Sequence, residues 1–229
     1  MAETISVTLS PTVVYVSGNV NGKTYTFTLS NITERGSLWV TDVDRSERDI
    51  YAVEITAIDA AGNTTSISTV IYYGLQYLIT DRTSDDVTRW KTLRDKGWAA
   101  MTDEEKAEWQ TSLKGAYNYV DMNRVEGAVQ YIAERMTALG YVISPDTHLV
   151  WSMEDFPTKA DMDRYFGNVA ALREMIAVYE TTPKAPTTAK KFDYRAANDI
   201  EQILLDVDGL LTKLTQSWHY VGEVIAGEV

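Results

Sequence analysis

The first third of the chain alternates apolar and polar residues in short runs, the pattern of half-buried β-strands. These runs occupy residues 5–9, 14–16, 25–29, 37–40, 51–58 and 66–72, and Thr, Val, Tyr and Ile dominate them. Turn signals separate the runs, and the clearest is Asn21-Gly22, because both residues accept the positive φ of a tight hairpin. About six short strands at this spacing predict a small antiparallel sandwich over residues 1–79.

After residue 80 the apolar residues recur every three or four positions, as in amphipathic helices. Two short helices are expected to begin at the capping sequences 83–86 and 102–105. The first is expected to end at Gly97 and the second before Gly115. Three longer apolar stripes then predict helices over residues 122–139, 162–179 and 200–225, and Thr158 after Pro157 is expected to begin the second of them. Their alternating three- and four-residue steps indicate coiled-coil-like packing, so residues 80–229 are predicted to form an all-α helical bundle.

The apolar stripes leave the oligomeric state open. They can pair within one chain as a three-helix bundle or between copies as the stalk of a homotrimer. We favour pairing within one chain, because the connections between the three helices are long enough for an antiparallel return.

The composition argues against several kinds of partner and functional site. The 229 residues include 21 Lys and Arg against 33 Asp and Glu, a formal net charge of −12, which argues against nucleic acid or an anionic membrane surface as partner. The chain has no Cys, which excludes disulfides, thiolate metal sites and cysteine nucleophiles. The chain has only two His, and it lacks a glycine-rich phosphate loop and a serine nucleophile elbow. These features favour a protein that is not an enzyme and binds no cofactor.

Targeting signals are also missing. Residues 1–10 contain neither a basic cluster nor an unbroken apolar run, so no signal peptide is expected. No apolar run approaches the roughly 20 residues that a membrane span needs, so we expect no membrane insertion.

A group of oxygen-bearing side chains between two predicted strands is the best candidate for a metal site. Asp42, Asp44, Ser46 and Asp49 could surround a hard cation such as Ca²⁺. The turn glycine and the distal bidentate Glu of a calcium loop are missing, so a solvated acidic loop is the preferred interpretation. Asp206 and Asp208 are expected on the exposed face of the last helix. His148 and His219 lack a second ligand at metal-binding spacing.

Aromatic residues offer the best candidate for a binding surface. Trp39 with Tyr25, or Tyr72 with Tyr73, could form a platform for stacking sugars on the sandwich. Packing is the favoured role of most large rings, and the Trp residues of the helical part, at positions 90, 98, 109, 151 and 218, are expected to point inward.

The polar segment 115–126 is interpreted as architecture. Asn118 and Asp121 can bind backbone donors at the start of a helix, and Arg124 can pair with an acid on a neighbouring helix.

Several segments of the helical part carry a resemblance: residues 78–83, 97–98, 101–102, 114–118, 123–126, 151–157 and 197–201. Together they resemble tail-associated structural proteins of phages and prophages of gut Firmicutes. Residues 57–65 resemble the strand-turn-strand segment of bacterial Ig-like modules. The expected fold is therefore a two-domain chain, an all-β Ig-like sandwich (1–79) followed by an all-α helical bundle (80–229).

The resemblance implies a non-enzymatic component of a virion, associated with a tail, baseplate or fibre and assembled in the bacterial cytoplasm. Other virion or tail proteins are the expected partners. The alternative is an adhesin that binds a host-surface receptor or glycan through the sandwich aromatics. A hydrolase is a third hypothesis, which would need a pocket with two acids of perturbed pKa.

Overall fold

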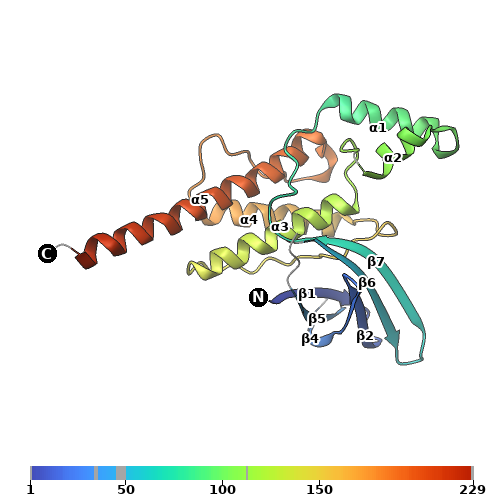
Figure 1. The fold of residues 1–229 in the computed structure, drawn as a ribbon, viewed down its shortest axis with the longest axis horizontal. Coiled ribbons are helices and arrows are strands. Elements are labelled where there is room, and N and C mark those ends of the chain that lie inside the picture. Colours follow the sequence, from blue (N-terminus) through green and yellow to red (C-terminus); the bar gives the residue numbers. More distant parts are fainter. Residues whose placement is uncertain (1, 34–35, 45–49, 112, 228–229) are drawn as a thin grey trace. The chain divides into compact units, whose positions relative to one another are not determined.

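The computed structural model describes residues 2–33, 36–44, 50–111 and 113–227, and the following statements refer to these residues. Seven strands precede five α-helices and two short 3₁₀ helices (Figure 1). The chain divides into two compact units. The first contains Met1–Tyr77, Tyr119–Tyr131 and Asp146–Phe156, and the second contains Leu78–Asn118, Ile132–Pro145 and Pro157–Val229.

The strands of the first unit form two antiparallel sheets, one in the order β1-β5-β4 and one in the order β3-β2-β6-β7. Their bounds are β1 Ala2–Leu9, β2 Val13–Val20, β3 Lys23–Thr26, β4 Thr28–Thr33, β5 Gly36–Asp44, β6 Ile50–Asp59 and β7 Thr64–Tyr72. Asn21 (φ 50°) and Gly22 (φ 85°) close the β2–β3 hairpin, which confirms the predicted turn.

The single strand expected over residues 25–29 is two strands in different sheets. Phe27 separates β3 from β4, donates its backbone N–H to the carbonyl of Val16 at 3.0 Å and is only 2% exposed. The chain therefore crosses from one sheet to the other at a residue whose ring is buried in the core. The alternation of residues 25–29 carries no sign of this change, because apolar residues sit at every second position throughout.

The expected fold class is wrong, because the sheets do not form an all-β domain of their own. Leu149 and Val150, which lie outside any helix or strand, belong to the same apolar core as Val16, Tyr51 and Ile71. Residues 119–131 of helix α3 (Tyr119–Ala138) also belong to the first unit. The protein is mixed α/β, with 43% helix and 25% strand.

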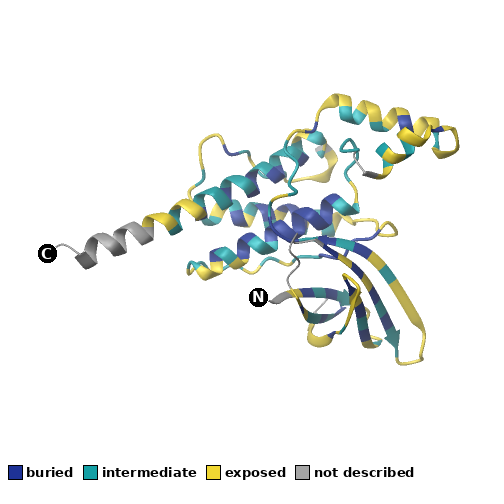
Figure 2. Ribbon diagram, viewed as in Figure 1, coloured by how far each residue is buried: buried dark blue, intermediate teal, exposed yellow. Residues whose placement is uncertain are grey.

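Helix α3 explains part of this difference. Residues 121–129 are all buried, and Figure 2 shows this half of α3 in the dark blue of buried residues. A helix buried all round cannot be recognised by an apolar stripe alone, because polar residues occupy some of its buried positions. The first break between the units follows Tyr77, whereas the boundary was expected at residue 79. The sequence did not predict that part of α3 and residues 146–156 belong to the first unit.

The second unit is helical. Its elements are α1 Ser84–Lys96, η1 Trp98–Ala100, α2 Asp103–Thr111, the end of α3, α4 Lys159–Met175, η2 Ala189–Lys191 and α5 Tyr194–Gly227. The predicted helix starts are confirmed: capping boxes join Thr83 to Asp86 and Thr158 to Asp161. A third joins Thr102 to Glu105. Each supplies acceptors for backbone N–H groups that have no partner within the helix.

The lengths of the last two helices differ from those expected. Helix α4 ends at Met175, so Tyr179 lies beyond it rather than on its apolar stripe. The Arg173 guanidinium donates to the carbonyl oxygens of Thr182 and Pro183, at 3.2 and 2.6 Å, and thereby holds the departing chain. Helix α5 begins six residues before the first expected apolar position, Ile200, because Asp193 accepts backbone N–H groups at its first turn.

The core of the second unit follows the predicted periodicity. Helices α4 and α5 pack against each other, and their buried apolar residues are Tyr165, Phe166, Val169, Leu172, Ala197, Ile200, Ile203, Leu204, Val207 and Leu211. Arg135 at the end of α3 forms an ion pair with Asp208 of α5. The predicted stripes of α3 and α5 are buried from Met122 to Met136 and from Ile200 to Leu211, whereas the stripe of α4 ends before Ile176 and Tyr179.

Two helical glycines give a matched test of packing. A Cβ on Gly127 would lie 1.8 Å from the carbonyl oxygen of Tyr72, whereas one on Gly209 of α5 would have nothing within 4 Å. We expect Gly127→Ala to lower the free energy of unfolding by about 1–3 kcal/mol or more, through overpacking. Gly209→Ala should raise it by up to about 1 kcal/mol, since Ala is the better helix former. Urea denaturation measures both; equal effects would contradict the close approach at Gly127.

Candidate functional site

The four aromatic residues singled out for sugar stacking do not share one surface. Trp39 and Tyr73 lie in the core of the first unit, each 7% exposed. Tyr25 is half-buried and its hydroxyl donates to Asp44, while Tyr72 meets Tyr77 edge to face at 5.4 Å. Burial raises the pKa of Tyr72. Only Tyr25 and Tyr72 of the four retain substantial exposure.

The Trp residues expected to point inward divide into two groups. Trp151 is 5% exposed, and Trp90 and Trp109 stack at 6.3 Å. Trp98 is 49% exposed, so the expectation is wrong there, because η1 lies between two short helices with little core to cover it. The side chain of Trp218 lies outside the described ones, as does that of His219.

The acidic loop is described only in part. Asp42 accepts a hydrogen bond from Thr4 at 2.7 Å, and Asp44 pairs with Lys23 at 2.5 Å. Lys23 lowers the pKa of Asp44. Ser46 and Asp49 lie outside the described residues. Among the residues that are described, no group of three or more His, Asp or Glu side chains is arranged to hold a metal ion.

Asp206 and Asp208 are not on an exposed helix face as expected. Both are half-buried, and Asp206 accepts hydrogen bonds from Thr182 at 2.6 Å and from Gln202 at 2.7 Å. The apolar stripe of α5 could not reveal this, because it says only which face is most deeply buried. His148 packs its ring edge-on against Trp151 at 4.5 Å.

A buried amide joins three segments of the first unit. Asn123 of α3 is fully buried, and its Oδ1 accepts the backbone N–H of Trp151 at 2.8 Å. Its Nδ2 donates to the Trp151 carbonyl and to Thr69 Oγ1, both at 2.9 Å, and to the Val70 carbonyl at 3.2 Å. The amide therefore binds the backbone of Trp151 through both polar atoms, as a neighbouring strand would.

Two further side chains complete this cluster. Thr69 on β7 donates its hydroxyl to the Trp151 carbonyl at 2.6 Å. Glu126, which is 1% exposed, accepts the backbone N–H of His148 at 2.9 Å and the indole N–H of Trp151 at 3.3 Å. We call Thr69, Asn123, Glu126 and Trp151 the Asn123 cluster. Its polar atoms fasten residues 148–151 to α3 and β7.

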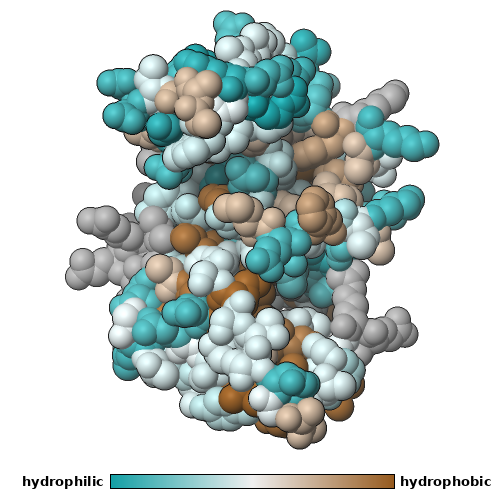
Figure 3. Space-filling view, turned by 90° about the vertical axis from the view of Figure 1, so that its right-hand side faces the viewer, coloured by the Kyte–Doolittle hydropathy of each residue, from teal (hydrophilic) through white to brown (hydrophobic). Residues whose placement is uncertain are grey.

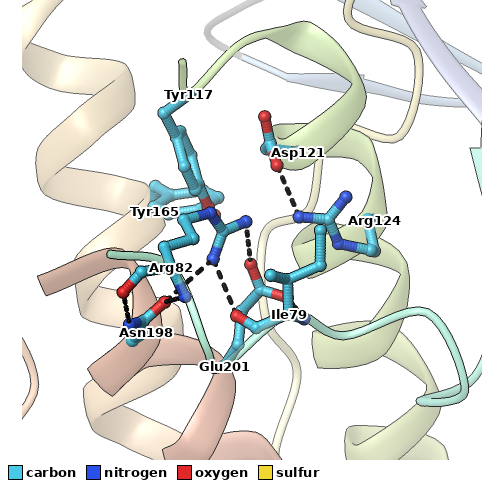
Figure 4. A network of polar contacts seen from close by, with 8 residues as sticks. All are labelled: Ile79, Arg82, Tyr117, Asp121, Arg124, Tyr165, Asn198 and Glu201. Atoms are coloured by element: carbon cyan, nitrogen blue, oxygen red, sulfur yellow. Dashed lines mark hydrogen bonds and ion pairs between the residues drawn. The ribbon is translucent and has the colours of Figure 1, made fainter. Parts of the chain in front are cut away.

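A buried ion pair joins two segments of the second unit. Arg82 lies before α1 and Glu201 on α5, and their side chains, 2% and 0% exposed, meet at 2.7 Å (Figure 4). Arg82 also donates to the carbonyl oxygen of Ile79 at 2.7 Å. The second Glu201 oxygen accepts the backbone N–H of Ile79.

Asn198 of α5 completes this second group. Its Nδ2 donates to the Arg82 carbonyl at 2.9 Å and its Oδ1 accepts the Arg82 backbone N–H at 3.1 Å. We call Ile79, Arg82, Asn198 and Glu201 the Arg82 cluster. As with Asn123, an amide side chain binds both polar groups of one backbone residue, so the cluster fixes residues 79–82 on the first turns of α5.

Helix α3 carries a separate buried ion pair. Arg124 pairs with Asp121 one turn earlier, with side-chain exposures of 6% and 7% (Figure 4). This acid lies on the same helix as Arg124, in the i, i+3 geometry that brings side chains together.

A cavity of about 230 Å³ lies beside the Arg82 cluster in the second unit. Its rings are Tyr117, Phe192 and Tyr194. Tyr117 meets Phe192 edge to face at 4.9 Å, lies under the Arg82 guanidinium at 5.5 Å and shares a hydroxyl hydrogen bond with Tyr165. Lys114 at the rim pairs with Asp81 at 2.7 Å and lowers the pKa of that carboxyl. The three rings give the cavity an apolar wall, and Arg82, Lys114 and Asp193 also line it.

Comparison with known proteins adds no relative. A scan against protein-family models, a search of curated proteins and a search of solved structures all give no match. Among the described residues, no helix is both long and apolar enough to cross a bilayer.

Most members of both clusters were recognisable in the sequence as motif residues, but their contacts could not be predicted. Asn123 and Glu126 fall at buried positions of α3, and Glu201 follows the buried Ile200. A polar residue placed on an apolar helix face was the available signal, since such residues need partners. The sequence does not say where those partners are, because they lie far away along the chain, 119 residues in the case of Arg82 and Glu201.

Within the Arg82 cluster, we expect Arg82 and Glu201 to be strongly coupled in their effects on the free energy of unfolding. Glu201→Ala leaves a buried guanidinium without its carboxylate, so we expect a loss of about 3–5 kcal/mol in the free energy of unfolding. Arg82→Met combined with Glu201→Leu should recover much of that loss, because no charge then remains unpaired. Asp44→Ala, which breaks an exposed ion pair, is the control and should change the free energy of unfolding very little. Denaturant titration measures all three variants, and the coupling is refuted if the double variant is no more stable than Glu201→Ala.

The Asn123 cluster gives a second test. Asn123→Ala removes an acceptor and a donor that serve a buried backbone segment, so we expect a loss of about 2–4 kcal/mol. Asn31→Ala, at an exposed position with a local bond to Ile32, should change stability by about 0.5 kcal/mol or less. Tryptophan fluorescence during urea unfolding is the readout. Similar losses for both variants would contradict the role of Asn123.

Proposed function

We propose that this chain is a non-enzymatic structural component of a phage or prophage particle, associated with the tail, baseplate or fibre and located in the virion. The observation that carries the proposal is that the buried polar side chains form contacts within the fold. Asn123, Glu126, Arg82 and Glu201 all bind backbone or side chains of remote segments. Such groups stabilise a particular shape, and their hydrogen bonds are committed to the fold.

The resemblance supports the same proposal. The segments that carry it include many of the residues that join remote parts of the chain: Ile79, Arg82, Lys114, Asn123, Glu126, Trp151, Asn198 and Glu201. A likeness that includes such residues concerns shape. Other virion proteins are the proposed partners, and the net charge of −12 favours partner surfaces with a basic character.

The alternative, a glycan- or receptor-binding adhesin, has less support. Of its four proposed aromatic residues, Trp39 and Tyr73 are buried in the core. Tyr25 and Tyr72 remain, on β3 and β7, which are the two edge strands of the same sheet. A stacking platform needs neighbouring rings on one exposed surface.

Particle composition tests the proposal directly. In particles purified by density gradient from a strain that encodes this chain, immunoblotting should detect it at a constant ratio to the major tail protein, while an abundant host cytoplasmic protein is removed. Detection only in the soluble lysate would contradict the proposed location.

A further inference from the structure

The backbone of β7, an edge strand of the four-stranded sheet, is covered over only part of its length. The Val70 carbonyl accepts the Asn123 side chain at 3.2 Å, so Val70 directs its backbone polar groups away from β6. Backbone direction alternates along a strand, and the regular register of β6 with β7 keeps that alternation. The N–H and C=O groups of Thr64, Ser66 and Ser68 therefore also point outward, where the described residues of the first unit leave them open to a further strand.

This stretch of β7, residues 64–68, which we call the open edge, lacks the features that usually protect a sheet edge. It contains no charged residue and no Pro, and its pairing with β6 has no bulge. By contrast β3, the other edge strand of the same sheet, carries Lys23 in an ion pair with Asp44. Figure 3 shows the side of the molecule on which the β6–β7 hairpin lies in Figure 1, and the surface of the strands there is mostly pale, the colour of residues of intermediate hydropathy such as Ser and Thr. An uncharged edge of this kind is a template for another strand.

The sequence of β7 is symmetric about Ile67. Residues 65–69 read Thr-Ser-Ile-Ser-Thr, which is the same in both directions. In an antiparallel pair centred on Ile67, each of these residues lies opposite a residue of its own type. Ser66 of one strand then forms a hydrogen-bonded pair with Ser68 of the other, because both direct their backbone groups outward. A two-fold contact brings one surface against itself, so a symmetric segment suits a second copy of the same chain.

We propose that the open edge of β7 pairs with the open edge of a second copy of this chain, antiparallel and centred on Ile67. The two four-stranded sheets then join into one continuous sheet. Ile67 is half-buried and lies opposite the buried Ile55 of β6, so two Ile67 side chains placed side by side cover the surface that each leaves exposed. The pairing ends at residue 69, because Asn123 already binds the Val70 carbonyl.

Charge does not oppose this contact, although each copy has a formal net charge of −12. On β6, Glu54 lies opposite Ser68 and Thr56 lies opposite Ser66. In the proposed register Ser68 of one copy meets Ser66 of the other, so a row across the contact reads Glu54, Ser68, Ser66, Thr56. An acid of one sheet therefore shares its row with a hydroxyl of the other sheet. The inference goes beyond the proposed location in a particle and does not depend on it.

Removal of one backbone donor tests the pairing. Ser68→Pro deletes an N–H that points away from β6, so the sheet of a single copy keeps its hydrogen bonds, whereas the symmetric pair loses two. In sedimentation equilibrium, the mass of the unchanged chain should rise with concentration from 25.7 kDa towards twice that value. Ser68→Pro should raise the dissociation constant about tenfold or more. The matched control Ser68→Ala keeps the N–H and should associate as the unchanged chain does.

Circular dichroism shows whether both variants keep their fold. A constant mass of 25.7 kDa for the unchanged chain, or equal dissociation constants for folded Ser68→Pro and Ser68→Ala, would overturn the pairing.

Cross-linking tests the register without a change in the backbone, and the chain has no Cys of its own to interfere. Purified Ser66→Cys protein is mixed with Ser68→Cys protein of different mass under mild oxidation. The Cα atoms of a hydrogen-bonded antiparallel pair lie about 5.5 Å apart, within the reach of a disulfide. The mixed disulfide should therefore exceed each same-variant disulfide about tenfold, whereas random collision gives about a twofold excess.

Thr24→Cys with Thr26→Cys is the matched control, since both positions are exposed and two residues apart on β3. This control pair should give the random ratio. The random ratio for Ser66→Cys with Ser68→Cys would overturn the proposal, even if the chain associates, because another surface would then form the contact.

Discussion

A polar group taken out of water needs a partner inside the protein, and this constraint determines which distant parts of the chain are joined here. Asn123, Glu126, Arg82 and Glu201 are each at most 5% exposed. For all four, the partners include backbone N–H or carbonyl groups of residues that lie outside any helix or strand. Leaving any of these groups unpaired would cost about 1–3 kcal/mol, and more for a charge.

The same arrangement occurs in both units. Asn123 binds the N–H and carbonyl of Trp151, and Asn198 binds those of Arg82. In each unit an irregular segment is thereby attached to a helix by an amide that imitates a strand partner. Residues 148–151 and 79–82 are fixed in this way without being helix or strand. This explains how a chain with long connections keeps ordered segments, and why its strongest polar contacts are structural.

The sequence predicted what depends on neighbouring residues and missed what depends on remote ones. The Asn21-Gly22 hairpin, the capping boxes at Thr83, Thr102 and Thr158, and the apolar stripe of α5 all follow from local chemistry. The sheet change at Phe27 and the membership of α3 in the first unit depend on packing between remote segments.

The candidate site shows the same division. Arg82, Asn123 and Glu201 belong to recognisable sequence motifs. Their partners could not be predicted, because sequence spacing gives no distance between segments so far apart.

The central claim is that the buried polar groups hold the fold, and native-state hydrogen exchange tests it most directly. The amide protons of Trp151 and Ile79 are accepted by Asn123 and Glu201 although neither residue lies in a helix or strand. The account predicts that both exchange only through unfolding of their unit, as slowly as amides in β6 and α5. Exchange at the rate of an exposed loop would contradict it, and would show that these contacts open independently of the fold.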